Sequence, residues 1–135
     1  MKSFLTKTTL MGLALVALLL TTAENIWAHH SVAEFDSERS LTIHGVVKEV
    51  WYNNPHVRYY VAVVDADGKE TTWDVHTSSV NVLVRRGWTK DSVKVGDVVD
   101  MTGSPTREGL PRLLIHTVKL QNGTVVSTRR SDLDK

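Results

Sequence analysis

Hydrophobic and polar positions alternate over several short stretches of this chain, which is the pattern of half-buried β-strands. These stretches are rich in β-branched and aromatic residues and are separated by Gly, Pro, Asn or Asp. They predict five strands, over residues 40–52, 56–64, 69–76, 98–103 and 111–120. Asn122-Gly123 is typical of a hairpin turn, so we expect residues 124–127 to add a short sixth strand.

A single stretch between the third and fourth strands has helical spacing. Val80, Leu83 and Val84 follow an i, i+3, i+4 pattern, and Ser78 or Ser79 is expected to cap the helix. Strand, strand, strand, helix, strand, strand is the order of an OB-fold. We therefore predict an all-β protein, a small five- to six-stranded OB-fold-like barrel over residues 40–127.

The same pattern gives an expected core and an expected irregularity. Apolar positions on the inward side of their elements predict buried side chains at Val46, Val61, Val63, Leu83, Val98 and Ile115. Gly45 lies in the middle of the first strand and predicts a bulge or a sharp bend there.

The first 28 residues have the features of a secretory signal peptide. Lys2 and Lys7 precede an uncharged apolar run at residues 10–20, which is too short to span a bilayer, and Ala28 ends an acceptable cleavage site. Cleavage would place residues 29–135 in the periplasm or outside the cell, without a membrane segment. We expect residues 29–39 to form a polar arm with Val32 and Phe35 as apolar anchors, and residues 128–135 to be a disordered, charged tail.

Charge and cysteine content exclude several classes of protein. Removing Lys2, Lys7 and Glu24 with the signal peptide leaves 14 basic and 14 acidic side chains, so nucleic acid is not expected as the main partner. The chain has no cysteine, which excludes disulfides, thiol catalysis and a lipoprotein anchor. Neither a phosphate-binding loop nor a serine-elbow motif occurs.

Histidines are the candidate metal ligands. All six, at positions 29, 30, 44, 56, 76 and 116, follow the expected cleavage site. Imidazole suits copper or zinc, and His29 as the first mature residue would offer an amine and an imidazole together. We expect His29 and His30 to approach His56, and His76 to lie at the same barrel end. The alternative is that these histidines serve the arm, the turn, the helix cap and the core.

Aromatic residues gather in the first three strands, where OB-folds bind ligands. The candidate ligand-binding residues are Trp51, Asn54, Tyr59 and Trp73. Tyr59 and Tyr60 are adjacent and must face opposite sides of the strand, so one of them lies outside the barrel interior. The alternative is that the large aromatics fill the core and the barrel ends.

The chain resembles a family of small exported bacterial proteins of unknown function. The motifs that carry this resemblance are His29-His30-Ser31, Thr42 to Val47, Trp51 to His56, Trp73 and Arg85 to Asp97. The chain departs from the family pattern by one extra residue between Trp51 and Asn54, by His76 where a Glu is common, and by Val93 for Leu. The resemblance implies an exported OB-fold-like domain and implies no activity.

Two functional hypotheses follow. The first is a non-catalytic periplasmic binding or accessory module, whose partner is a small ligand, a metal or a periplasmic protein. The second is a copper-dependent redox enzyme, in which the amine and imidazole of His29 and a further histidine form a three-nitrogen brace. Ligand, reaction and oligomeric state stay open at this point.

Overall fold

The computed structural model describes residues 33–128 of the 135-residue chain. The predicted signal peptide, His29, His30, Val32 and residues 129–135 lie outside the described residues. Within them there are six strands and one helix of a full turn or more. Their bounds are β1 Leu41–Trp51, β2 Arg58–Val64, β3 Glu70–His76, α3 Val80–Arg85, β4 Val98–Pro105, β5 Arg112–Leu120 and β6 Val125–Ser127.

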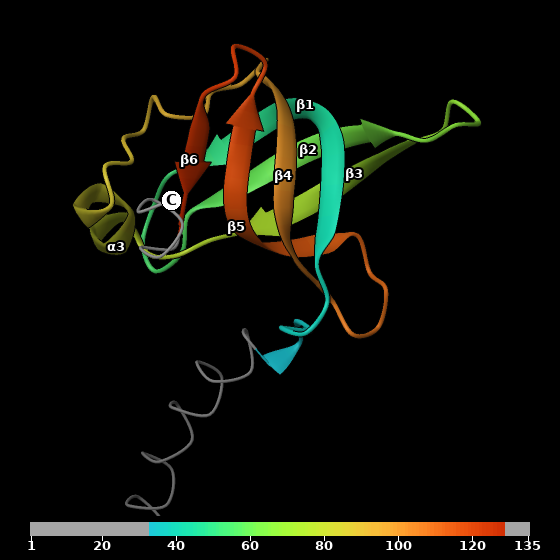
Figure 1. Cartoon of the computed structure of the whole chain (residues 1–135), viewed down its shortest axis with the longest axis horizontal. Coiled ribbons are helices and arrows are strands. Elements are labelled where there is room, and N and C mark those ends of the chain that lie inside the picture. The colour runs from blue at the N-terminus through green and yellow to red at the C-terminus, as the bar shows by residue number, and fades with distance from the viewer. Residues whose placement is uncertain (1–32, 129–135) are drawn as a thin grey trace, which may run out of the picture. The chain divides into compact units, whose positions relative to one another are not determined.

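The strands form one sheet that closes on itself (Figure 1). Their order is β3-β2-β1-β4-β5-β6, and the neighbours in this order are antiparallel. A parallel pairing of β3 with the start of β5 joins the two sides of the sheet. This is the closed five-stranded barrel of an OB-fold, with α3 between the third and fourth strands and β6 added at one edge, so the predicted fold class is confirmed.

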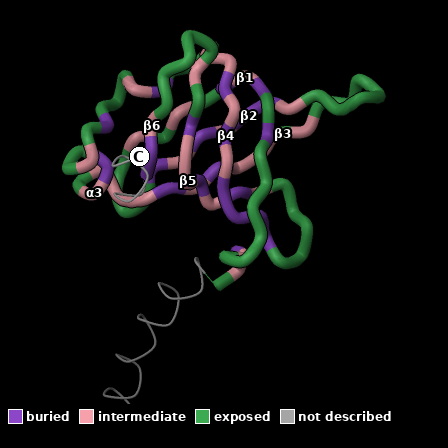
Figure 2. Tube along the Cα trace, in the orientation of Figure 1, coloured by how far each residue is buried: buried purple, intermediate pink, exposed green. Residues whose placement is uncertain are grey.

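The hairpin between β2 and β3 projects from one end of the barrel, and α3 lies at the other end (Figure 1). Its turn follows the predicted chemistry. The Asp65 carboxylate accepts the backbone N–H groups of Asp67 and Lys69, and Gly68 takes a φ of 81°. Residues 64–70 are exposed, as the green projecting hairpin in Figure 2 shows.

The core fills the barrel interior with inward-facing residues of β1 to β5, closed by Leu83 of α3 and by Trp88. Of the expected core residues, Val61, Leu83 and Ile115 are buried, whereas Val46, Val63 and Val98 are only partly buried. Val47 and Val99 are the inward neighbours, at 0% and 1% exposure. Because sheet side chains alternate, an error of one residue in the alternation of β1 and β4 exchanges the faces.

Gly45 allows β1 and β2 to approach each other closely, and it is not the site of the predicted bulge. A Cβ atom at this position would overlap the carbonyl oxygen of Ala62 on β2. The bulge in β1 lies further along, between Val47 and Glu49. The strand therefore contains both a tight contact and a bend, at different residues.

Helix α3 is capped from outside its own segment. Ser79 occupies the N-cap position, but its hydroxyl makes no capping hydrogen bond. Instead, Oδ1 of Asn54 accepts the N–H of Val80 at 3.1 Å. The predicted serine cap is therefore wrong, because a side chain of the loop after β1 accepts the hydrogen bond instead.

Residues that precede β1 and follow β6 also contact the barrel. In the N-terminal arm, Phe35 is buried and forms a single β-bridge with Thr106, which supports its role as an anchor. Thr128, the first residue of the expected tail, is 5% exposed, and its hydroxyl donates to the carbonyl of Ile115. No helix within residues 33–128 is long and apolar enough to cross a membrane.

Candidate functional site

The strongest concentration of chemically active side chains lies on the outside of the barrel, across the β2–β3 pair. The strand register forms two rows: Trp51 lies opposite Arg58 and Arg58 opposite His76, and Tyr60 lies opposite Asp74 and Asp74 opposite Arg112. The inward residues Tyr59 and Val75 lie between these positions on β2 and β3. We call this surface the outer β2–β3 face, comprising Trp51, Arg58, Tyr60, Asp74, His76 and Arg112.

Asp74 is the centre of this face. Its Oδ1 accepts Nε of Arg58 at 2.9 Å, its Oδ2 accepts Nη2 of the same guanidinium, and Arg112 Nε lies 3.5 Å from Oδ2. Burial raises the pKa of the Asp74 carboxyl, but the hydrogen bonds from His76 and Arg58 outweigh it and hold this pKa well below its usual range. The carboxylate therefore stays ionised and is unsuited to act as a general base.

The imidazole of His76 is enclosed by three neighbours. Its Nε2 lies 3.0 Å from Oδ2 of Asp74 and 3.3 Å from Nη2 of Arg112. Because a carboxylate can only accept, Nε2 donates to Asp74. The ring of Phe35 packs against the imidazole with centroids 5.5 Å apart. This environment fixes the orientation of the ring and leaves its side chain 13% exposed.

Arg58 connects the polar centre to the aromatic residues of the face. Its guanidinium carbon lies 5.4 Å from the centroid of the Tyr60 ring, a cation–π geometry. The hydrogen bond to Asp74 raises the pKa of Arg58 further above its already high value. Trp51, the cross-strand partner of Arg58, is 51% exposed. The face therefore presents a half-exposed indole beside a guanidinium whose position is fixed.

The four predicted ligand-binding residues lie in different environments. Trp51 lies on this face, whereas the side-chain oxygen of Asn54 is occupied by the cap of α3. Tyr59 is fully buried against Trp88, with ring centroids 6.4 Å apart, so its outward neighbour Tyr60 takes the surface position. Trp73 is partly buried and packs against the core.

The sequence predicts that His56 and His76 lie close together as metal ligands. Among the described residues they do not belong to a common group of metal-ligating side chains. His56 is exposed in the loop before β2, beside Val57, whose backbone pairs with Thr77 and Ser78. The His76 nitrogen points the other way along β3, toward Asp74. Within residues 33–128, no three His, Asp or Glu side chains form a group that could hold a metal ion. His29 and His30 lie outside the described residues, so their metal-binding role stays a prediction.

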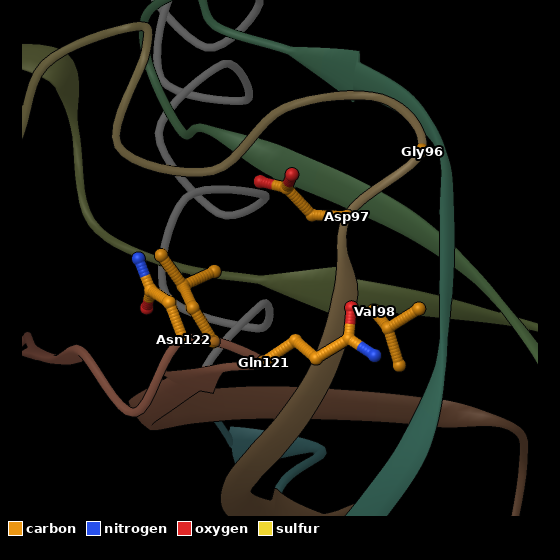
Figure 3. Close-up of a pocket in the computed structure, with 6 residues that line it drawn as sticks. Gly96, Asp97, Val98, Gln121 and Asn122 are labelled. Atoms are coloured by element: carbon orange, nitrogen blue, oxygen red, sulfur yellow. The ribbon is translucent and has the colours of Figure 1, made fainter.

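Two shallow hollows lie elsewhere on the surface, beside the start of β4 and the end of β5. One, with a volume of about 410 Å³, is lined by Gly96, Asp97, Val98, Leu120, Gln121 and Asn122 (Figure 3). Its polar groups stabilise turns: Asp97 accepts the N–H of Lys94, and Asn122 accepts the N–H of Thr124. The other, of about 330 Å³, adjoins the exposed pair of His44 and Asp100, whose Nδ1 and Oδ1 lie 2.6 Å apart. Neither hollow adds an aromatic side chain or a second imidazole.

Sequence reasoning missed the polar centre of the site. Strand alternation was sufficient to place Arg58 and Tyr60 on one face, because they are two residues apart. The meeting of Asp74 with Arg112, by contrast, depends on the parallel β3–β5 pairing that closes the barrel. No local signal in the sequence indicates that pairing.

Comparison with known proteins supports the family resemblance. A family model described as "Family of unknown function (DUF6152)" matches residues 16–114. A crystal structure of the mitochondrial single-stranded DNA-binding protein Rim1 of S. cerevisiae is 14% identical with a TM-score of 0.47, over 62% of this chain and 93% of that chain. No curated protein matches significantly. Because the family model spans more than half of the sequence, the chain belongs to DUF6152, a family of unknown function.

Proposed function

We propose that this protein is a non-catalytic binding or accessory module that acts in the periplasm or outside the cell, and that a partner protein contacts its outer β2–β3 face. The observation that carries this proposal is Trp51, a large aromatic side chain that is 51% exposed beside Arg58 and Tyr60. Trp, Tyr and Arg are the residues that dominate the binding energy of protein interfaces.

The polar centre favours binding over catalysis. Asp74 is held ionised by two guanidinium groups and His76, so the carboxylate has a structural partner on each oxygen. Residues held in this way keep the aromatic side chains beside them in place before a partner arrives. Such preorganisation reduces the entropy lost on association.

Site-specific photo-crosslinking in living cells tests this proposal. A benzophenone amino acid at position 60 should give a discrete adduct, and the same group at position 64 should not. Val64 is a suitable control because it is also exposed, at 59%, but belongs to the projecting hairpin. Trp51→Ala should abolish the adduct from position 60. Equal adducts from both positions, or an adduct that persists in Trp51→Ala, would contradict the proposal.

A second candidate function is the binding of copper or zinc through His29 and His30, and the arm contacts favour it. Glu34 pairs with Arg112 at 2.6 Å and Phe35 is buried, so the arm is fastened to the barrel five residues after the expected mature terminus. A copper-dependent redox enzyme with an N-terminal histidine brace is the catalytic form of this candidate.

Metal titration of protein purified with its native terminus tests this second function. Mass spectrometry should first give a mass for residues 29–135. Cu(II) and Zn(II) should then bind with an affinity that His29→Ala reduces strongly, and His44→Ala is the control because His44 is already paired with Asp100 on the barrel surface. Equal binding by both variants would exclude the N-terminal site. Loss of binding in His56→Ala would instead show that the loop after β1 supplies a ligand.

A further inference from the structure

The N-terminal arm binds the barrel as a short added strand. On either side of the Phe35–Thr106 bridge, the N–H of Arg107 donates to Glu34 at 2.9 Å and the N–H of Asp36 donates to Pro105 at 2.8 Å. Side chains complete the contact, with Glu34 on Arg112 and Phe35 against His76. This is the way in which many proteins bind extended peptides at a sheet edge.

The arm reaches this position only because the chain loops out before β1. Leu41 pairs with Gly103, so a continuous antiparallel ladder would bring Glu38 opposite Thr106. The actual partner of Thr106 is Phe35, three residues earlier. The extra residues form a turn, in which Asp36 accepts the N–H groups of Glu38 and Arg39 at 3.2 Å each. A straight continuation of the ladder would bring Phe35 opposite Gly109 instead.

The segment that forms this turn is complementary to a second copy of itself. Residues 37–40 read Ser-Glu-Arg-Ser, and all four are exposed. Two such segments that run antiparallel about a twofold axis bring Glu38 of each copy opposite Arg39 of the other. Opposite charges facing each other across two antiparallel strands stabilise the pair.

We propose that two copies of this chain exchange arms. The turn at residues 36–39 opens, the two straightened segments pair with each other, and residues 34–36 of each copy occupy the Thr106–Arg112 site of the other. A second copy is the occupant that the site fits, because it carries the same Glu-Phe-Asp sequence. The contacts of residues 34–36 with the barrel are remade, the two hydrogen bonds of the turn at Asp36 are lost, and the hinge pairing of Glu38 with Arg39 is gained.

Charge reversals at the hinge test arm exchange on the full chain as the cell processes it. Sedimentation equilibrium should show a monomer–dimer equilibrium. Glu38→Arg should weaken dimerisation about tenfold, since it places like charges opposite each other in both hinge pairs. The double variant Glu38→Arg/Arg39→Glu should restore it, because the two charges are again complementary. Both positions are exposed, so the fold of the monomer serves as its own control by circular dichroism.

Removal of the arm anchor gives an independent readout. The Phe35 contact is shared by the closed monomer and the exchanged dimer, so Phe35→Ala should release the arm in both and populate an open monomer at the expense of the dimer. Leu110→Ala, at an exposed residue of the β4–β5 loop, should leave the dimer intact. A chain that stays monomeric into the millimolar range overturns the proposal. So does a dimer that Glu38→Arg leaves unchanged, or one that the double variant fails to restore.

Discussion

Asn54 and Val80 are joined by a hydrogen bond that links two elements 26 residues apart in sequence. The side-chain oxygen of Asn54 lies 3.1 Å from the backbone nitrogen of Val80 and satisfies a donor at the start of α3. The loop after β1 and the helix are therefore one structural unit. Because Trp51 ends the strand that leads into this loop, the unit also determines where the exposed indole lies.

Replacement of Asn54 by Ala should destabilise the protein by about 1 kcal/mol, the usual cost of losing a helix cap. Urea denaturation followed by circular dichroism measures this change. Asn53→Ala is the matched control, because Asn53 is an exposed amide in the same loop. Equal stability of the two variants would mean that the hydroxyl of Ser79 replaces the lost cap.

Asp74→Asn should remove the charge that holds the outer β2–β3 face together. The variant leaves Arg58 and Arg112 without their shared carboxylate, and we expect a loss of about 1–3 kcal/mol in the free energy of unfolding. Equilibrium unfolding in urea at neutral pH provides the measurement. The fluorescence of Trp51 should change as well, because its cross-strand neighbour Arg58 loses its fixed position.

The same carboxylate should make stability depend on pH on the acid side. Although burial raises the pKa of Asp74, hydrogen bonds from His76 and Arg58 lower it further, so the folded value lies below the unfolded value of about 4. The contribution of Asp74 is complete above about pH 4 and is lost as the pH falls through the folded value. Asp74→Asn should flatten this acid limb, whereas Asp91→Asn, at an exposed carboxylate, should leave it unchanged.

Alanine at either of two strand glycines should be severely destabilising. A Cβ atom at Gly45 would overlap the carbonyl oxygen of Ala62, and one at Gly103 would overlap that of Leu114. We expect each variant to lose at least about 3 kcal/mol or to fail to fold. Gly68→Ala should lose only about 1 kcal/mol from its positive φ, because its Cβ would meet nothing within 4 Å. Thermal melting of the three variants provides the ranking.

Tyr59→Phe should be neutral or should stabilise the protein by up to about 1 kcal/mol. The hydroxyl of Tyr59 is buried and has no hydrogen-bond partner, so its removal relieves a desolvation cost. Burial also raises the pKa of Tyr59 far above that of a free tyrosine, and its ionisation should coincide with alkaline unfolding. Ultraviolet absorbance titration detects this step. Trp88→Phe is the contrasting variant, because it loses a 2.8 Å bond from Nε1 to Ser127 and should clearly destabilise.

Local pattern was sufficient to predict the strands, the helix and the barrel. The turn at Asp65 to Gly68 and the hairpin at Asn122-Gly123 are encoded by residues next to each other. The helix start was predicted correctly, but its cap was not. Asn54 reaches Val80 only after β2 and β3 have folded back between them, and no spacing in the sequence reports that distance.

The sequence predicted only the part of the candidate site that depends on local alternation. Trp51 is exposed where an alternating strand ends, and the adjacent tyrosines had to face opposite ways. The bulge between Val47 and Glu49 resets the alternation within β1, so Trp51 faces outward although strict alternation from Val47 would turn it inward. The pairing of Asp74 with Arg112 follows from barrel closure and is visible only in three dimensions.

The parallel pairing of β3 with β5 also sets an order of events in time. β1 can pair with its second neighbour only after β4 has been synthesised. The barrel can close only after Arg112 to Leu120 have been synthesised. Folds dominated by such distant pairings form slowly. In a chain still emerging from the ribosome, the barrel therefore stays open until residues 112–120 have been synthesised, while the local pairing of β1, β2 and β3 needs no later strand.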